Sequence, residues 1–186
     1  MGVALATAGA AAGFEVTLLL GPTPLDPPAG VHVVPFETGD DLRHLLAHHR
    51  HHYDILIMAA AVCDYRPQTR HAGKRHSTKG ESWQLALEAT DDLVAALAVA
   101  RASHQHVVAF ALENREHLDI RAHEKLKRKQ VDAIVANPLP TMDAKTIEPI
   151  WLGADGERDA PGTMTKAEAA QWIVGKLERW DEKKKK

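Results

Sequence analysis

The sequence has one cysteine, few aromatic side chains and no long hydrophobic run, and each shortage excludes a class of protein. Cys63 alone cannot form an internal disulfide, and no Cys/His spacing matches a structural zinc site, which favours a reducing cytoplasm. The most apolar run, from Ile55 to Cys63, is far shorter than the roughly 20 residues that cross a bilayer. The N-terminus has no basic region ahead of its small apolar residues, unlike a signal peptide. The sequence therefore predicts a cytoplasmic protein without a membrane segment.

Net charge is also small, because 23 Lys and Arg stand against 25 Asp and Glu, for a formal charge of -2 at pH 7. Such a molecule has no overall field that would attract nucleic acid or anionic lipid. The 186 residues, of which 45% are hydrophobic and 26% charged, fit an ordinary globular protein with one core. We expect a single domain over residues 1–186, with a charged tail at 181–186.

Short apolar segments alternate with helical patterns, which predicts a parallel sheet with helices on both faces. Residues 54–60 are apolar on both faces, as in a central parallel strand. Thr165 with Glu168 three residues later predicts a capping box. The expected strands are residues 15–20, 31–36, 54–60, 83–87, 107–112, 133–136 and 148–152, and the expected helices are 1–12, 40–50, 91–103, 115–129 and 165–180.

The end of the central strand is the first candidate for a binding site. Small residues at 59–62 lead into Cys63 and Asp64. Open α/β sheets bind ligands at the carboxyl ends of their strands, where small side chains let a flat ligand approach the backbone. Asp64 could accept a hydrogen bond from a sugar hydroxyl or an exocyclic amine. An Asp-capped turn at a strand end explains the same residues equally well.

Two clusters of cations are candidates for phosphate binding. Residues 65–80, here called the flap, hold five cations and no acid: Arg66, Arg70, Lys74, Arg75 and Lys79. Lys and Arg neutralise charge that develops on phosphorus, although a solvated loop would have the same composition. The helix at 115–129 ends in a second cluster, in which Lys125 and Lys129 share a face. Cations at a helix C-terminus also stabilise it by about 0.3–1 kcal/mol, so this cluster has a purely structural alternative.

Histidines and the cysteine give weaker signals. His44, His48, His49, His51 and His52 suggest a metal, but no acidic or cysteine ligand completes the set, so a solvated helix end is favoured and no metal site is predicted. No spacing singles out a histidine partner for Cys63. We therefore expect Cys63 to be a small buried packing residue.

Two motifs in order resemble the phosphopantothenoylcysteine synthetase family. Residues 58–67 are similar to the family's Ala-Ala-Val-Ala-Asp-Tyr-Arg-Pro run, and residues 125–129 followed by 132–137 resemble its second motif. The likeness covers roughly Met1 to Trp180 and includes Gly21-Pro22 and residues 110–113. It implies a Rossmann-like, doubly wound, mostly parallel sheet. The family's first strand, glycine-rich loop and asparagine-bearing segment lie before the point that matches Met1, so we expect the first central strand to be absent from this chain.

In a sheet of order 3-2-1-4-5 that absent strand would be central. The strands expected at residues 15–20 and 54–60 should then flank an open slot about 9–10 Å wide, twice the usual strand spacing.

The resemblance implies a ligase that joins 4'-phosphopantothenate and cysteine in coenzyme A biosynthesis. The family uses CTP as co-substrate, with Mg²⁺, to form an acyl-cytidylate. Lys74 would be the catalytic lysine of the flap. The nucleotide-binding residues carried over are Asp64, Thr90, Asp91, Asp92, Leu93, Phe110, Lys125 and Lys129. A homodimer is implied, as is a fused or associated decarboxylase, which would carry FMN.

The sequence also departs from the family. The flap reads Lys74-Arg75-His76-Ser77 and keeps only the first lysine of the Lys-x-Lys-Lys motif, with Lys79 as a possible substitute, and the stretch at 142–146 is shortened. A non-catalytic nucleotide- or phosphometabolite-binding remnant is therefore the alternative function. An RNA-binding patch made from the two cationic clusters lacks the aromatic platforms of single-strand binders, so no nucleic acid partner is expected.

Overall fold

The structure is a computed structural model that describes residues 1–69, 72–74, 76, 79–80, 82–141 and 144–182. Its helices are α1 (Gly2–Ala11), α2 (Gly39–His49), α3 (Leu93–Ala100), α4 (Leu118–Lys129) and α5 (Lys166–Glu182), with short 3-10 turns at Arg115–His117 and Leu139–Thr141. Its strands are β1 (Thr17–Leu20), β2 (His32–Pro35), β3 (Ile55–Met58), β4 (Tyr65–Pro67), β5 (Leu87–Ala89), β6 (His106–Glu113), β7 (Ala133–Pro138), β8 (Thr146–Ile147), β9 (Ile150–Gly153), β10 (Arg158–Asp159) and β11 (Met164–Thr165).

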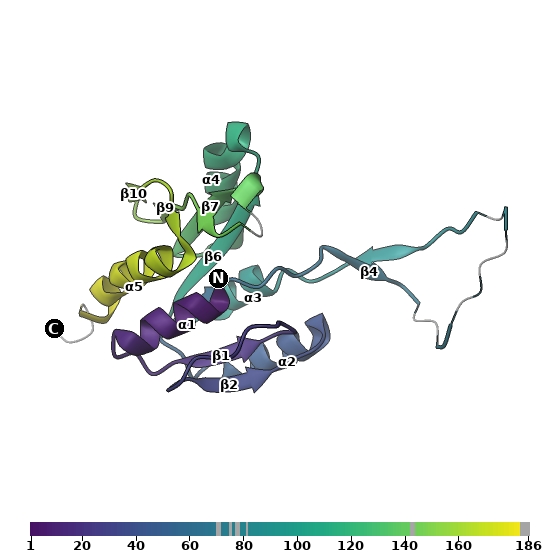
Figure 1. Ribbon diagram of the computed structural model, residues 1–186, viewed down its shortest axis with the longest axis horizontal. Helices are drawn as coiled ribbons and strands as arrows, with labels where there is room; N and C mark the ends of the chain where they lie inside the picture. The colour runs from purple at the N-terminus through teal and green to yellow at the C-terminus, as the bar shows by residue number, and fades with distance from the viewer. Residues whose placement is uncertain (70–71, 75, 77–78, 81, 142–143, 183–186) are drawn as a thin grey trace.

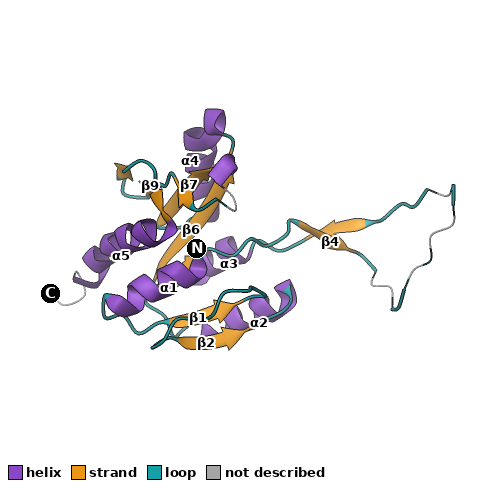
Figure 2. Cartoon of the chain, in the orientation of Figure 1, coloured by secondary structure: helices purple, strands orange, loops and turns teal. Residues whose placement is uncertain are grey.

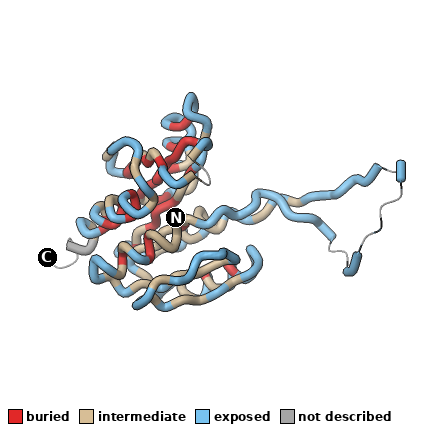
Figure 3. The backbone as a smooth tube through the Cα atoms, viewed as in Figure 1, coloured by how far each residue is buried: buried red, intermediate tan, exposed pale blue. Residues whose placement is uncertain are grey.

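The main sheet has the strand order β10-β9-β7-β6-β3. Strands β3, β6 and β7 are parallel, whereas β9 and β10 are antiparallel additions at one edge. Alternate residues of β6 and β7 enter two cores, one under α3 and α4 and the other under α1 and α5. The buried residues in Figure 3 gather along this sheet and the helix faces that cover it. The predicted mostly parallel α/β sheet with helices on both faces is confirmed.

Strands β1 and β2 form a separate two-stranded parallel sheet, next to α2. Neither strand pairs with β3, so the order of a doubly wound sheet is interrupted between β1 and β3. A cleft of about 1170 Å³ occupies the interruption, and its lining includes Leu19 of β1, Ile57 of β3 and Ala6 of α1. This cleft has the position expected for an absent central strand. The three residues of β3 before Met58 are only half-buried, although their sequence is apolar on both faces.

A two-stranded arm leaves the body after Cys63 and returns at Thr90. Strands β4 and β5 pair antiparallel in it, and Figures 1 and 2 show the arm extending away from the rest of the molecule. The predicted strand at 83–87 is wrong in its bounds and in its burial, because β5 begins only at Leu87 and both Leu85 and Leu87 are exposed. The alternating side chains that predicted a half-buried strand belong to an arm that no core covers.

Helix ends follow their local sequence signals. Thr165 and Glu168 form the predicted capping box at the start of α5: Thr165 N donates to the Glu168 carboxylate at 2.7 Å, and Glu168 N donates to Thr165 Oγ1 at 3.2 Å. Thr38 and Asp41 cap α2 in the same way. Each pair satisfies backbone N–H groups that have no partner within the helix. Among the described residues, no helix combines the length and apolar character that a membrane span requires.

Candidate active site

The carboxyl end of β3 opens into the mouth of the cleft. The chain runs from Met58 through small residues to Cys63, and Thr90 and Asp91, where the arm returns to the body, line the same opening. Thr90 Oγ1 donates to the Cys63 carbonyl at 2.5 Å, and Thr90 N donates to the Asp64 carbonyl at 3.0 Å. The fold thus brings the predicted site residues Asp64 and Thr90 together, although they are 26 positions apart in the sequence.

Asp92 starts helix α3 and also holds a lysine of α4. Its Oδ1 accepts a hydrogen bond from Ala95 N at 3.1 Å, and both of its carboxylate oxygens lie 2.8 Å from Lys129 Nζ. Partial burial opposes ionisation of Asp92, but the hydrogen bonds from Lys129 and Ala95 outweigh it and hold the pKa of Asp92 below its ordinary value. Leu93 follows, half-buried against the core under α2. The predicted contact segment at residues 90–93 therefore turns from the cleft mouth into the start of α3.

The ion pair of Asp92 with Lys129 makes a testable prediction about acid titration. Lys129→Met should raise the pKa of Asp92, because the favourable hydrogen bond is lost while the burial remains. NMR titration of the Asp92 carboxyl would report this change, and Lys127→Met, on an exposed face of α4, should leave it in place. The Asp92 charge stabilises the fold above its unfolded pKa, and this contribution is lost as pH falls through the lower folded pKa. An unchanged Asp92 pKa in Lys129→Met would contradict this assignment.

Lys125 is likewise paired. Its Nζ lies 2.6 Å from Glu113 Oε1 at the end of β6, and Arg121 reaches the other oxygen of Glu113 at 3.1 Å. The hydrogen bond from Lys125 lowers the pKa of Glu113, and Arg121 adds to this effect against the cost of burial. Both predicted phosphate-binding lysines of α4 therefore have carboxylate partners on neighbouring elements. An incoming phosphate would compete with Glu113 and Asp92 for them.

Phe110 lies half-buried on β6, in the core under α1 and α5.

Asn137, which sequence reasoning did not single out, is 5% exposed near the end of β7. It is in register with Leu112, two positions beyond Phe110, and therefore lies on the same face of the sheet. Its Oδ1 has no hydrogen-bond partner among the described residues. A buried polar side chain in an otherwise apolar strand was the signal that could have identified it.

Lys74 and Lys79 are exposed on the outer part of the arm. Within the described part of the chain, no hydrogen bond or ion pair joins Lys74 to the other predicted site residues, and the arm points away from the body (Figure 1). Of the other flap cations, Arg70 and Arg75 lie outside the described residues, as do Met142 and Asp143 of the shortened stretch. Tyr65 and Arg66, at the start of the flap, line the cleft, whereas the described part of the arm beyond them extends away from the body in a single chain.

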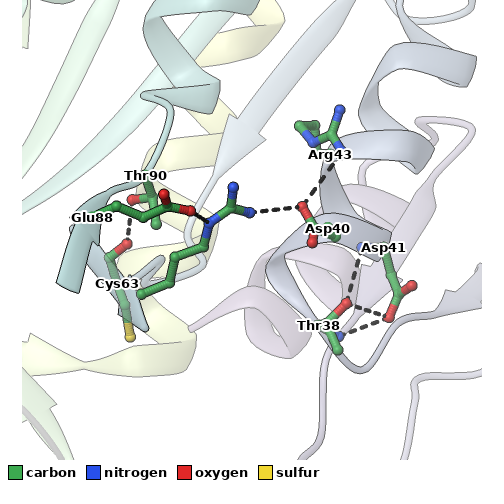
Figure 4. Close-up of polar contacts among 8 residues, drawn as sticks. Thr38, Asp40, Asp41, Arg43, Cys63, Glu88 and Thr90 are labelled. Carbon is green, nitrogen blue, oxygen red and sulfur yellow. Dashed lines mark hydrogen bonds and ion pairs between the residues drawn. The ribbon is translucent and has the colours of Figure 1, made fainter. Parts of the chain in front are cut away.

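Arg66 stands at the base of this arm. Its Nε donates to Glu88 Oε1 at 2.7 Å and its Nη1 to Asp40 Oδ1 at 3.3 Å, as the dashed lines in Figure 4 show. These contacts, led by the hydrogen bond to Glu88, raise the pKa of Arg66. The sequence identified Arg66 only as one of five flap cations. Its two carboxylate partners come from distant positions that spacing alone could not connect.

Cys63 is exposed, so its predicted role as a buried packing residue is wrong. Met58 is the only buried residue of β3, and the residues from Ala59 to Cys63 that follow it line the open cleft. No group of three or more His, Cys, Asp or Glu that could hold a metal is found among the described residues. The histidines at 44, 48, 51 and 52 are exposed and His49 is half-buried.

Comparison with known proteins places these features in a family. The family model described as "DNA/pantothenate metabolism flavoprotein C-terminal domain" matches residues 1–180. The chain belongs to this family. A crystal structure of the C-terminal domain of the coenzyme A biosynthesis bifunctional protein CoaBC superposes with a TM-score of 0.82 at 30% identity, covering 98% of this chain and 82% of that one. This family is the one expected from the two motifs.

Curated relatives are longer than this chain. A protein named cysteine/cysteine sulfinic acid decarboxylase, from an unknown prokaryotic organism, is 39% identical over 182 residues, which are 95% of this chain and 50% of that protein. The CoaBC protein of Borreliella burgdorferi is 29% identical and matches 94% of this chain and 44% of its own length. The chain thus spans about half the length of these relatives. A Cab2 variant in complex with phosphopantothenate-cysteine shares the fold, with a TM-score of 0.67 and 17% identity over 84% of this chain and 56% of that one.

Proposed function

We propose that this chain is a phosphopantothenate-cysteine ligase domain that acts in coenzyme A biosynthesis. The family match over residues 1–180 carries this proposal. The cleft mouth supports it, because small residues, a carboxylate and the start of α3 converge at the carboxyl end of a parallel strand. A related fold that binds phosphopantothenate-cysteine, in Cab2, supports the substrate class.

The reaction proposed for this site has two steps. A carboxylate oxygen of 4'-phosphopantothenate attacks the α-phosphorus of CTP, the bond to the β-phosphate breaks, and pyrophosphate leaves. The amine of cysteine then attacks the acyl carbon of the acyl-cytidylate, forms the amide, loses a proton and expels CMP. Neither step needs a protein nucleophile, so positioning and electrostatic stabilisation of the phosphates would supply the catalysis. A mechanism without a protein nucleophile agrees with the sequence, which singles out no histidine that could activate Cys63.

Each site residue has a proposed part in this reaction. The nucleotide would lie at the cleft mouth against Asp64 and the segment 90–93, with Phe110 lining its pocket. Lys125 and Lys129 would release their carboxylate partners and bind the phosphates of the nucleotide. Lys74 would stabilise the reacting phosphate. Mg²⁺ usually binds nucleotide phosphates with one or two carboxylates, and Asp91, exposed on the cleft lining, offers such an oxygen donor.

The position of Lys74 supports a homodimer. The arm carries exposed apolar side chains, with Tyr65 62% exposed, Leu85 47% and Leu87 48%. A contiguous exposed apolar surface on a projecting element is typical of an interface. A second copy that packs on the arm would bury these side chains and could bring Lys74 of one copy to the cleft of the other.

The half of the longer relatives that this chain does not match supports a fused or associated decarboxylase, and FMN would bind only there.

The two α4 lysines give a prediction about binding. Lys125→Ala and Lys129→Ala should each weaken CTP binding by about 1–3 kcal/mol, the cost of a lost charge-assisted contact. Isothermal titration calorimetry would measure it, with the exposed Lys127→Ala as the matched control. Unchanged affinity in both variants would limit these lysines to their ion pairs with Glu113 and Asp92.

The placement of Lys74 favours a second candidate function, a non-catalytic nucleotide- or phosphometabolite-binding domain, because in a single chain the arm that carries this lysine points away from the body. Pyrophosphate release distinguishes the two candidates. The ligase should release pyrophosphate only when phosphopantothenate is present, with CTP and not with ATP, and cysteine should convert a single burst into steady turnover. Nucleotide binding without any pyrophosphate release would support the binding domain instead.

A further inference from the structure

The arm joins the body through a narrow base. Its two strands are closed there by the pairs Tyr65↔Ala89, Arg66↔Glu88 and Pro67↔Leu87, and by the two hydrogen bonds of Thr90. A two-stranded ribbon is only marginally stable by itself, and the side chains of β4 are exposed. Core packing therefore does not set the angle between the arm and the body.

Arg66 connects this ribbon to helix α2. Across the ribbon its Nε donates to Glu88 at 2.7 Å, and toward the body its Nη1 donates to Asp40 at 3.3 Å. A guanidinium group is planar, so the two contacts lie on different edges of one rigid group. In Figure 4, Glu88 and Asp40 lie on opposite sides of the arginine that joins them. The orientation of the strand pair is thereby linked to the position of Asp40.

Asp40 is itself well fixed. It lies in the first turn of α2, next to the capping box in which Thr38 N donates to Asp41 at 2.8 Å and Asp41 N donates to Thr38 at 3.1 Å. The same helix is anchored in the core by Leu42 and Leu46, which are 3% and 5% exposed. Arg66 thus joins a rigid element of the body, through Asp40, to the ribbon, through Glu88. These two contacts of Arg66 are here called the link.

We propose that Arg66 is a positioning residue that holds the arm at a defined angle to α2. Its effect on overall stability is small, because its side chain is 54% exposed and exposed ion pairs contribute little. Its effect on the arm is larger, since the base of the ribbon has few other contacts with the body. Under the function proposed above, the link also keeps Asp64 and Thr90 in place at the cleft mouth, but the link itself does not depend on that function.

Distances between spin labels test the proposal directly. Labels at Leu85→Cys on the arm and Ala47→Cys on the exposed face of α2 are introduced with Cys63→Ser, which removes the native thiol and keeps the carbonyl that Thr90 uses. Pulsed dipolar spectroscopy is recorded without nucleotide, on protein that carries a β-strand ahead of Met1 to fill the cleft. Labelled protein is diluted in unlabelled protein so that only distances within one chain are read. The protein with Arg66 intact should give a narrow distribution.

Arg66→Gln and Asp40→Asn should each broaden that distribution at least two-fold. Arg66→Lys should broaden it less than Arg66→Gln does, because lysine keeps the positive charge. Salt at about 1 M, where the screening length falls to about 3 Å, should broaden it as well. Arg43→Gln is the matched control, because Arg43 also pairs with Asp40, at 3.4 Å, but does not touch the arm. Equal widths with Arg66 and with Gln at this position would overturn the proposal. A narrow distribution in a protein that releases no pyrophosphate would instead contradict the proposed function and leave the link standing.

Discussion

Lys74→Gln will reduce phosphopantothenate-dependent pyrophosphate release by at least about 10²–10³-fold, the loss seen when one preorganised donor to a reacting centre is removed. Glutamine keeps the length and polarity of the side chain but cannot neutralise charge on phosphorus. The exposed position of Lys74 on the arm means that the substitution should leave the fold intact. The measurement is a coupled pyrophosphate assay with saturating CTP, on substituted and unsubstituted protein that both carry the missing N-terminal strand ahead of Met1.

Lys79→Gln is the control for that result, because Lys79 is a second exposed lysine of the same flap. We expect it to lower the rate far less than Lys74→Gln does. Equal losses in the two variants would mean that the flap acts through its total charge. A Lys74→Gln enzyme with full turnover would remove Lys74 from the catalytic site.

A β-strand supplied ahead of Met1 will stabilise the 186-residue chain by several kcal/mol and make its unfolding cooperative. The unpaired edges of β1 and β3 line a cleft of about 1170 Å³, together with apolar side chains of α1. Unpaired backbone groups and exposed apolar surface together are a large penalty for a fold whose net stability is typically ~5–15 kcal/mol. We expect the chain alone to aggregate or to unfold gradually, with dye binding typical of loosely packed states.

The matched variant carries the same added strand with prolines at alternate positions, which cannot donate the ladder hydrogen bonds. Calorimetry and circular dichroism should show one sharp transition with the intact strand and none with the proline variant. A sharp two-state transition of the 186-residue chain alone, as a monomer in solution, would contradict this view of the cleft.

The sheet could be predicted well because its strands are marked locally. Residues 107–112 and 133–136 are continuous apolar segments between helical patterns, and they became β6 and β7 in the middle of the sheet. The interruption between β1 and β3 was also predictable, but only through the resemblance to a family with one more strand. Nothing in the composition of residues 15–20 or 54–60 indicates an unpaired edge.

The arm could not be predicted in the same way. Trp83, Leu85 and Leu87 occupy alternate positions as in a half-buried strand, yet all three are about half exposed. Periodicity reports that one face is apolar, but it does not say whether that face meets a core of the same chain or another surface.

The roles given to the candidate site residues stay predictions, and the contacts that these residues make could not be predicted from the sequence. The hydrogen bond between Thr90 and Asp64 forms only because the arm returns to the body beside its starting point. The partners of Lys125 and Lys129 were not predicted either, because Glu113 and Asp92 reach these lysines only through the packing of α3, α4 and β6. Arg66 and Asp40 meet for the same reason. Long-range ion pairs follow from tertiary structure, which local sequence patterns do not specify.

The central claim, ligation through an acyl-cytidylate, is tested most directly by following the carboxylate oxygens of phosphopantothenate. With both of these oxygens labelled with ¹⁸O, attack on the α-phosphorus and departure of CMP must leave one labelled oxygen in CMP and the other in the amide product. Mass spectrometry of the nucleotide should therefore find one ¹⁸O in each CMP formed. Unlabelled CMP, or label in inorganic phosphate, would contradict the acyl-cytidylate mechanism.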